Sequence, residues 1–339
     1  MNTRAFIAGC SGFELTPDEA AFFREAQPWG FILFRRNVDS PEQVRALCAS
    51  LRDTVGRTDA PILIDQEGGR VQRMGPPHWP KYPAGRTYGQ LHANDPLVQR
   101  EITRLGARLI AHDLRSVGIT VDCLPVLDVP SPGSHDIIGD RAYGKMPAQV
   151  AVLGRAAAEG LMAGGVLPVV KHMPGHGRAG ADSHLSLPVV EASREELARH
   201  DFAPFRMLTD MPLAMTAHVV YTALDPENPA TTSRIVMEEI IRGHIGYDGL
   251  VMTDDLSMHA LSGSFRSRTE AAFAAGCDMG LHCNGSMEEM SAVAEAAPIL
   301  AGDALRRANA ALARITHDPE PLDPVDARDR LDSALAMIA

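Results

Sequence analysis

Residues 166–177 read Val-Leu-Pro-Val-Val-Lys-His-Met-Pro-Gly-His-Gly, and this stretch shows most clearly how the chain folds. Its first five residues are apolar and short enough to form a fully buried strand. Titratable residues begin where the apolar run ends, and Gly175 and Gly177 loosen the segment after it. The pattern is typical of a parallel strand that is buried on both faces and carries polar groups at its carboxyl end.

The same pattern recurs along the chain. Apolar runs of strand length cover residues 6–8, 30–34, 61–65, 120–124, 166–170, 212–218, 249–254 and 278–283. Amphipathic stretches of helical length cover residues 16–27, 41–55, 96–117, 147–163, 194–208, 233–245 and 268–275. An alternation of apolar strands and helices predicts a parallel sheet, and the presence of eight strands favours closure into a (β/α)8 TIM-type barrel.

An open doubly wound sheet is the alternative α/β fold. It would place a Gly-rich phosphate-binding turn after an early strand, but Gly68-Gly69 belongs to no dinucleotide-binding fingerprint. We therefore expect a single (β/α)8 barrel domain over residues 1–339, with C-terminal helices from about residue 303. Ser40-Pro41 and Asp95-Pro96 predict two helix starts, because Ser and Asp cap helices and Pro fits the first helical position.

Composition restricts the partners and the compartment. The formal net charge of −11 and the pI near 5.6 argue against a nucleic-acid or anionic-membrane surface. No segment has the length of uncharged apolar sequence that a membrane span needs, and the N-terminus lacks the pattern of a secretory signal. The five scattered cysteines are typical of buried reduced thiols. We expect a cytoplasmic, monomeric protein.

Polar residues follow most of the predicted strands at the same end. In a (β/α)8 barrel, catalytic residues come from the carboxyl ends of strands and from the loops after them. The candidates at these positions are Asp65, Arg73, Asp128, Arg141, Lys171, His172, His218 and Asp254.

Several candidates also have a purely structural interpretation. Asp254 and its neighbour Asp255 could cap the next helix, and Asp65 could accept backbone amides. Arg73 and Arg141 could form surface ion pairs. These interpretations are independent, and all would have to hold at one end of the barrel. We therefore interpret the set as an active site.

A zinc site is a rival interpretation of the loop. His172, His176, Asp182 and His184 are residue types that bind zinc. However, Pro174 and Gly175 separate the first two histidines, so no helix aligns them. Lys171 would also place a positive charge beside the metal. We therefore expect no metal and no other cofactor.

At these residues the chain resembles glycoside hydrolase family 3, and within it the single-domain bacterial β-N-acetylglucosaminidases. The resemblance rests on motifs that occur in the family's order over residues 60–290. They are Asp65-Gln-Glu-Gly-Gly-Arg-Val-Gln-Arg73, Gly139-Asp-Arg141, Lys171-His-Met-Pro-Gly-His-Gly177, Asp182-Ser-His184 and Thr253-Asp-Asp-Leu-Ser-Met258. Met173 departs from the family, which usually has Phe there, and the loop 178–181 is less typical of it.

The resemblance implies a role for each residue. It implies that Asp254 is the nucleophile and that His184, held by Asp182, is the general acid/base. It implies that the hydroxyls of the terminal sugar are bound by Asp65, Arg73, Arg141, Lys171 and His172. The implied substrate is an N-acetylglucosaminyl-anhydromuramyl peptide, from which terminal N-acetylglucosamine is removed in cytoplasmic peptidoglycan recycling.

A histidine acid/base also makes physical sense in this chain. A retaining glycosidase needs a nucleophile and a proton donor, usually two carboxylates. A histidine with an ordinary pKa near 6.5 can transfer protons close to neutrality, and an aspartate two residues away could fix its tautomer. Three alternatives stay open: another family 3 β-glycosidase such as a β-glucosidase, a glycoside phosphorylase, and a non-enzymatic sugar-binding module.

Overall fold

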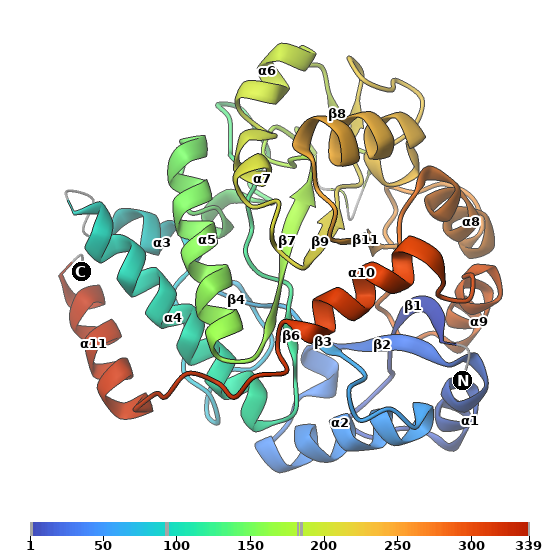
Figure 1. Ribbon diagram of the computed structural model, residues 1–339, viewed down its shortest axis with the longest axis horizontal. Coiled ribbons are helices and arrows are strands. Elements are labelled where there is room, and N and C mark those ends of the chain that lie inside the picture. The colour runs from blue at the N-terminus through green and yellow to red at the C-terminus, as the bar shows by residue number, and fades with distance from the viewer. Residues whose placement is uncertain (1–2, 92–94, 182, 184–185, 338–339) are drawn as a thin grey trace.

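The structure, a computed structural model, describes residues 3–91, 95–181, 183 and 186–337. Eight parallel strands close into a barrel in the order β1-β12-β11-β9-β7-β6-β3-β2, and helices surround it (Figure 1). The strands are β1 (Arg4–Gly9), β2 (Pro28–Leu33), β3 (Ile62–Ile64), β6 (Val121–Asp122), β7 (Leu167–Met173), β9 (Leu213–Thr216), β11 (Leu250–Asp255) and β12 (Met279–His282). The predicted (β/α)8 barrel is confirmed, and each predicted apolar run supplies one strand.

The barrel closes because its first strand pairs on both sides. Ile7 lies opposite Leu281 of β12 and opposite Gly30 of β2. Inward-facing apolar side chains fill the interior, among them Leu63 and Val169, which are fully buried. The barrel is therefore a packed core, and a ligand can enter only at its ends.

Helices cover the outside of the barrel. They are α1 (Pro17–Ala26), α2 (Pro41–Val55), α3 (Gly85–Gln90), α4 (Pro96–Ser116), α5 (Pro147–Ala163), α6 (Arg194–Arg199), α7 (Ala203–Met207), α8 (Phe265–Ala275), α9 (Met287–Ala296), α10 (Gly302–Ala313) and α11 (Pro324–Ala336). A π-helix, η4 (Val236–Ile245), precedes β11, and short 3-10 turns are η1 (Arg35–Asn37), η2 (Gly139–Arg141) and η3 (Ala230–Thr232). The two predicted caps are present: the side chains of Ser40 and Asp95 accept hydrogen bonds from the backbone at Gln43 and Val98.

The prediction of one continuous helix between β7 and β9 is wrong. The sequence predicts a helix over residues 194–208, but the structure has α6 and α7 with a break at residues 200–202. Pro204 lies in the first turn of α7, where its missing N–H is tolerated, whereas within a longer helix it would remove a hydrogen bond. The sequence analysis also missed α3 and α9.

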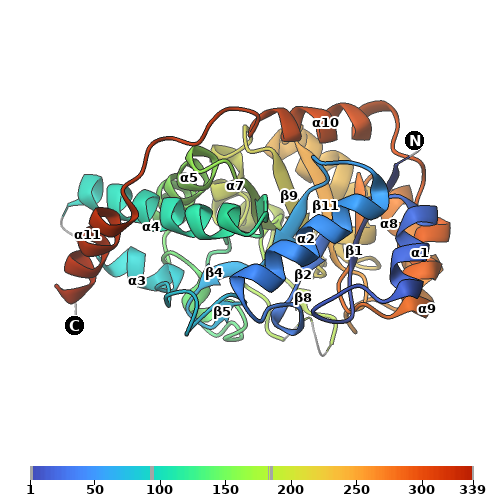
Figure 2. The same ribbon diagram turned by 90° about the horizontal axis from the view of Figure 1, so that it is seen from below.

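The C-terminal helices pack on the barrel. Ala308 and Ala311 of α10 join the apolar cluster inside the barrel. Helix α11 lies against α4, as Figure 2 shows. Arg328 of α11 donates to Asp113 at 2.8 Å, and Tyr82 donates to the same carboxylate at 2.7 Å. These contacts hold α11 against α4 and against the loop that carries Tyr82.

Two small sheets that the sequence analysis did not predict lie among the loops after the strands. Strand β4 (Gln66–Gly68) pairs with β5 (Val71–Gln72), and β8 (Val189–Val190) pairs with β10 (Val220–Tyr221). The β4–β5 hairpin returns the chain to the barrel mouth just after β3. Across the described residues, no helix is long and apolar enough to cross a membrane.

Candidate active site

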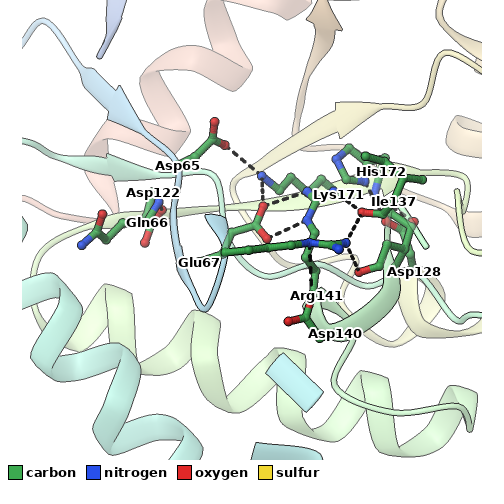
Figure 3. Close-up of polar contacts among 12 residues, drawn as sticks. Asp65, Gln66, Glu67, Asp122, Asp128, Ile137, Asp140, Arg141, Lys171 and His172 are labelled. Atoms are coloured by element: carbon green, nitrogen blue, oxygen red, sulfur yellow. Dashed lines mark hydrogen bonds and ion pairs between the residues drawn. The ribbon is translucent and has the colours of Figure 1, made fainter. Parts of the chain in front are cut away.

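Five charged side chains of alternating sign form a chain across the barrel mouth. Arg73 contacts Asp65 at 2.8 Å, and Lys171 contacts Asp65 at 3.0 Å and Glu67 at 2.7 Å. Arg141 closes the chain with two 2.8 Å hydrogen bonds to Glu67. Figure 3 shows Lys171 placed between the two carboxylates and Arg141 directed at Glu67. Residues from three separate segments, 65–73, 139–141 and β7, are thus held in one network.

Local structure explains why these residues meet. Strand β7 extends through Met173, so Lys171 lies within the strand rather than in the loop after it. Residues 65–73 turn back through the β4–β5 hairpin, which brings Asp65 and Arg73 together. Gly68 and Gly69 adopt positive φ angles of 90° and 58° at this turn, a conformation that glycine adopts without strain.

The network keeps its members charged. Burial alone would raise the pKa values of Asp65 and Glu67, but Lys171, Arg73 and Arg141 outweigh it and lower both. Burial alone would lower the pKa of Lys171, yet the two carboxylates raise it. The alternative interpretation of Arg141 as a surface ion-pair partner is wrong, because its side chain is only 10% exposed.

Another carboxylate, that of Asp128, organises the two histidines at the carboxyl end of β7. Asp128 lies 2.6 Å from Nδ1 of His172 and also accepts the backbone N–H groups of His172 and His176. The pKa of Asp128 falls to about 2, because His172 and these hydrogen bonds outweigh the effect of burial. An imidazole whose Nδ1 faces a carboxylate turns its other nitrogen, Nε2, away from it.

Asp254 and Asp255 at the end of β11 have different surroundings. Asp254 lines the cavity and accepts one backbone N–H, that of Asp255. Asp255 holds the turn after β11, because it accepts the backbone N–H groups of Ser257 and Cys283. Ser264 caps the next helix, α8, so the helix-capping alternative is wrong for Asp254 and for Asp255.

The charge of Asp254 is set by its neighbours. Burial alone would raise its pKa, but His218 and His172 outweigh that effect and lower it, with a smaller contribution from Lys171. The sequence analysis did not assign His218 this effect. The Asp254 carboxylate is therefore ionised at neutral pH.

These groups open into one cavity of about 250 Å³. The predicted residues Asp65, Arg73, Arg141, Lys171, His172 and Asp254 all line it. Apolar side chains line it as well, and the guanidinium of Arg73 lies 5.1 Å from the ring centre of Phe34. A mixed polar and apolar wall suits a sugar, whose hydroxyls need hydrogen bonds and whose ring carbons need packing.

The two remaining predicted residues, Asp182 and His184, lie outside the described residues. Ser183, between them in sequence, is described and buried, and its Oγ lies 3.2 Å from Nε2 of His176. Among the described residues, no group of three or more His, Cys, Asp or Glu side chains is arranged to hold a metal ion. All five cysteines are buried and unpaired.

Three residues of this site had no part in the mechanism expected from the sequence. Glu67 stood within a recognised motif, Asp128 was a candidate only from its position after the fourth strand, and His176 was considered only as a zinc ligand. All three are polar residues that come directly after an apolar strand or lie beside a candidate in sequence. This pattern predicts their position at the end of a strand, but it does not predict which side chains they contact.

Comparison with known proteins identifies the family. Residues 14–317 match the glycosyl hydrolase family 3 N-terminal domain. The chain belongs to glycosyl hydrolase family 3. A family 3 resemblance is thus confirmed over most of the chain, and all the described residues that line the cavity fall within the matched residues.

Individual relatives agree with this family 3 assignment. A β-hexosaminidase of Pseudomonas aeruginosa (strain LESB58) is 40% identical over 276 residues, which cover 80% of each chain. A β-hexosaminidase of Aromatoleum aromaticum (strain DSM 19018 / LMG 30748 / EbN1) is 36% identical over 319 residues, covering 93% of this chain and 87% of the relative.

Solved structures extend the family 3 likeness to the fold. NagZ from Neisseria gonorrhoeae, solved in complex with N-trifluoroacetyl-D-glucosamine, superposes with a TM-score of 0.85 at 31% identity and covers 100% of this chain and 98% of that one. A family 3 β-N-acetylglucosaminidase from Paenibacillus sp. str. FPU-7 gives a TM-score of 0.84 at 32% identity, covering 97% of this chain and 67% of that one. This family 3 protein is therefore a β-N-acetylglucosaminidase, and the binding-module alternative is wrong.

Proposed function

We propose that the enzyme is a monomeric, cytoplasmic, retaining exo-β-N-acetylglucosaminidase that removes terminal N-acetylglucosamine from 1,6-anhydro muropeptides in peptidoglycan recycling. One observation carries the proposal. The partly buried carboxylate of Asp254, with a lowered pKa, faces a cavity of about 250 Å³ that it shares with Asp65, Lys171 and Arg73. Such a cavity suits one terminal sugar rather than a length of polysaccharide, which supports exo-cleavage.

Asp254 acts as the nucleophile in the first step. Its Oδ forms a bond to the anomeric carbon of the sugar, while the bond from that carbon to the departing oxygen breaks and takes the bonding electrons to the oxygen. His184 gives that oxygen a proton. The anionic state of Asp254 needs no base to create it, because His218 and His172 already lower its pKa.

Water completes the reaction in the second step. His184, now neutral, accepts a proton from water, and the water oxygen bonds to the anomeric carbon as the bond to Asp254 breaks. Asp182 orients the imidazole of His184 and stabilises its protonated form. Two displacements at one carbon return the original β configuration.

The remaining predicted residues bind the sugar. The carboxylate of Asp65 accepts hydrogen bonds from hydroxyl groups, and Arg73, Arg141 and Lys171 donate to hydroxyl or carbonyl oxygens. His172, with Nδ1 on Asp128, offers Nε2 to the cavity. Since the ion pairs already fix these side chains, little conformational entropy is lost when the sugar binds.

The substrate assignment draws its support from relatives. N-trifluoroacetyl-D-glucosamine is the ligand in the Neisseria gonorrhoeae NagZ complex, and that protein covers the whole of this chain. A 2-acylamino sugar is therefore the proposed occupant of the cavity. The anhydromuramyl aglycone is inferred from the resemblance to the single-domain bacterial enzymes of the family.

The proton-transfer role of His184 is tested by varying the leaving group. His184→Ala should lose more activity on N,N′-diacetylchitobiose than on an aryl N-acetylglucosaminide with an acidic phenol, which departs without a proton. The difference should lie in the range of ~10²–10⁴-fold that general acid catalysis provides. Equal losses on both substrates would contradict the role.

Two further assays separate the alternatives. Faster hydrolysis of nitrophenyl glucoside than of nitrophenyl N-acetylglucosaminide would favour a β-glucosidase. A rate that rises with inorganic phosphate and yields sugar-1-phosphate would favour a phosphorylase.

A further inference from the structure

The carboxyl end of β7 and the residues that follow it are arranged around one carboxylate, that of Asp128. Oδ1 of Asp128 accepts the backbone N–H groups of His172, at 3.2 Å, and of His176, at 2.6 Å. Its Oδ2 lies 2.6 Å from Nδ1 of His172. Asp128 is fully buried, and Figure 3 shows it beside His172. A single side chain therefore fixes both histidines relative to the barrel.

His176 extends this arrangement to the next loop. Its Nε2 lies 3.2 Å from Oγ of Ser183, and both residues are 3% exposed. Burial lowers the pKa of His176 to about 4, so its ring is neutral at pH 7. A neutral imidazole has one donor and one acceptor nitrogen, and a hydroxyl can pair with either.

The position of Ser183 in the sequence gives this contact its importance. Ser183 is bonded directly to Asp182 and His184. Neighbouring Cα atoms are about 3.8 Å apart, so fixing one residue restricts where its neighbours can lie. A proton donor must lie within hydrogen-bond reach of the departing oxygen, and a displacement of about 1 Å can cost ~10²-fold in rate.

We propose that His176 is a positioning residue of the reaction, which anchors Ser183 and thereby the adjacent proton-transfer residues, while Asp128 holds His176 in place. This inference rests on the proposed role of His184. It gives His176 a purpose that neither sugar binding nor nucleophilic attack supplies. It also gives the Ser183 hydroxyl a specific function, the contact with His176, beyond separating Asp182 from His184 in the sequence.

A packing role is the alternative. The rings of His172 and His176 lie edge to face with centroids 5.7 Å apart, so His176 also fills space beside a sugar-binding residue. Loss of packing would lower stability and would slow every substrate to a similar degree. Loss of positioning would slow mainly those substrates whose leaving group needs a proton.

The test compares Ser183→Ala with the matched variant Ser186→Ala, since Ser186 is an exposed serine on the same loop. Ser183→Ala should lower kcat/KM for N,N′-diacetylchitobiose by about tenfold or more, with a much smaller loss for an aryl glycoside with an acidic phenol. Ser186→Ala should match the parent enzyme. Equal losses for Ser183→Ala on both substrates would overturn the proposal.

Variants at His176 test the same contact from its other side, independently of the Ser183 variant. His176→Ala should show the same dependence on the leaving group, and His176→Gln should restore part of the lost activity, because its amide reaches a similar position to Nε2. Melting temperatures separate folding from positioning. If His176→Gln lost as much on the disaccharide as His176→Ala while both were folded, the proposal would be wrong.

A combined variant distinguishes this inference from the proposed function beneath it. Ser183→Ala should cause no further loss on the disaccharide when added to His184→Ala, since the proton donor it positions is gone. A further loss of the full size would overturn the positioning role alone. If His184→Ala lost equal activity on both substrates, the result would instead contradict the proposed proton-transfer role of His184, and with it this inference.

Discussion

Glu67 accepts two hydrogen bonds from the single guanidinium of Arg141, one from Nε and one from Nη2, each at 2.8 Å. The same carboxylate contacts Lys171 at 2.7 Å, and the side chain of Glu67 is only 3% exposed. Glu67 therefore serves to hold two cations that line the cavity. A sugar hydroxyl that approached it would have to compete with both.

Removing the charge of Glu67 should weaken both substrate binding and stability. Glu67→Gln leaves Arg141 without an ionic partner among the residues that the structure describes, and breaking a buried ion pair from one side costs about 3–5 kcal/mol. We expect a lower melting temperature and a rise in KM that exceeds the fall in kcat. The control is Glu159→Gln, which removes a surface pair with Arg100 and should change stability by about 0–1 kcal/mol. Similar effects of the two variants would refute this account of Glu67.

The assignment of Asp254 predicts a covalent intermediate. Asp254→Ala should lower turnover by about 10⁴-fold or more, as is typical when a nucleophile is removed, and the variant should remain folded. A 5-fluoro N-acetylglucosaminyl inactivator should label the peptide that contains Asp254, detected by mass spectrometry. Labelling of Asp255 in place of Asp254, or no labelling of an active enzyme, would contradict the assignment.

Asp122 predicts an unusual dependence of stability on pH. Its Oδ1 accepts the backbone N–H of Gln66, while Oδ2 has no hydrogen-bond partner among the described residues. Burial raises the pKa of Asp122 from 3.8 to about 8. The folded state thus keeps a proton that the unfolded chain releases above pH 3.8, and Asp122 costs stability increasingly as pH rises from about 4 to about 8.

A neutral replacement should remove that cost. Asp122→Asn keeps an oxygen for Gln66 and cannot ionise, so it should stabilise the protein by about 0.5–2 kcal/mol at pH 8 and by less at pH 5. Urea unfolding at the two pH values measures the difference. A loss of stability at pH 8 would show that the Asp122 carboxyl is ionised in the folded protein and stabilised by Lys171.

The proposed mechanism predicts a rate that does not depend on a metal. The Nδ1 atom of His172 already faces Asp128, and the proposed steps use only side chains and water. EDTA treatment should leave kcat/KM for nitrophenyl N-acetylglucosaminide unchanged. Loss of activity that added zinc restores would revive the metal site of His172, His176, Asp182 and His184.

The sequence predicted the barrel because each strand is a short apolar run, a pattern that local composition alone determines. The strand bounds were less certain. The predicted run 166–170 stops before Lys171, whereas β7 continues to Met173. A charged residue usually indicates that a buried strand has ended. Lys171 is stable inside the strand because it forms ion pairs with the carboxylates of Asp65 and Glu67.

The candidate site was predicted in part for the same reason. Asp65, Arg73, Arg141, Lys171, His172 and Asp254 were found from their positions after strands, and they line one cavity. Glu67 was not a candidate and Asp128 was a candidate without a role, because the importance of each lies in its contacts with side chains that are distant in sequence. Asp254 and Asp255 are adjacent and identical in type, and only their hydrogen bonds separate them.

Product analysis on an N-acetylglucosaminyl-1,6-anhydromuramyl peptide tests the proposed function most directly. Proton NMR during the first minutes of the reaction identifies both the released sugar and its anomeric form before mutarotation. The proposed mechanism predicts release of N-acetylglucosamine as the β-anomer, because attack by Asp254 and then by water inverts the anomeric carbon twice. Release of the α-anomer or of a sugar-1-phosphate, or no cleavage of this substrate, would contradict it.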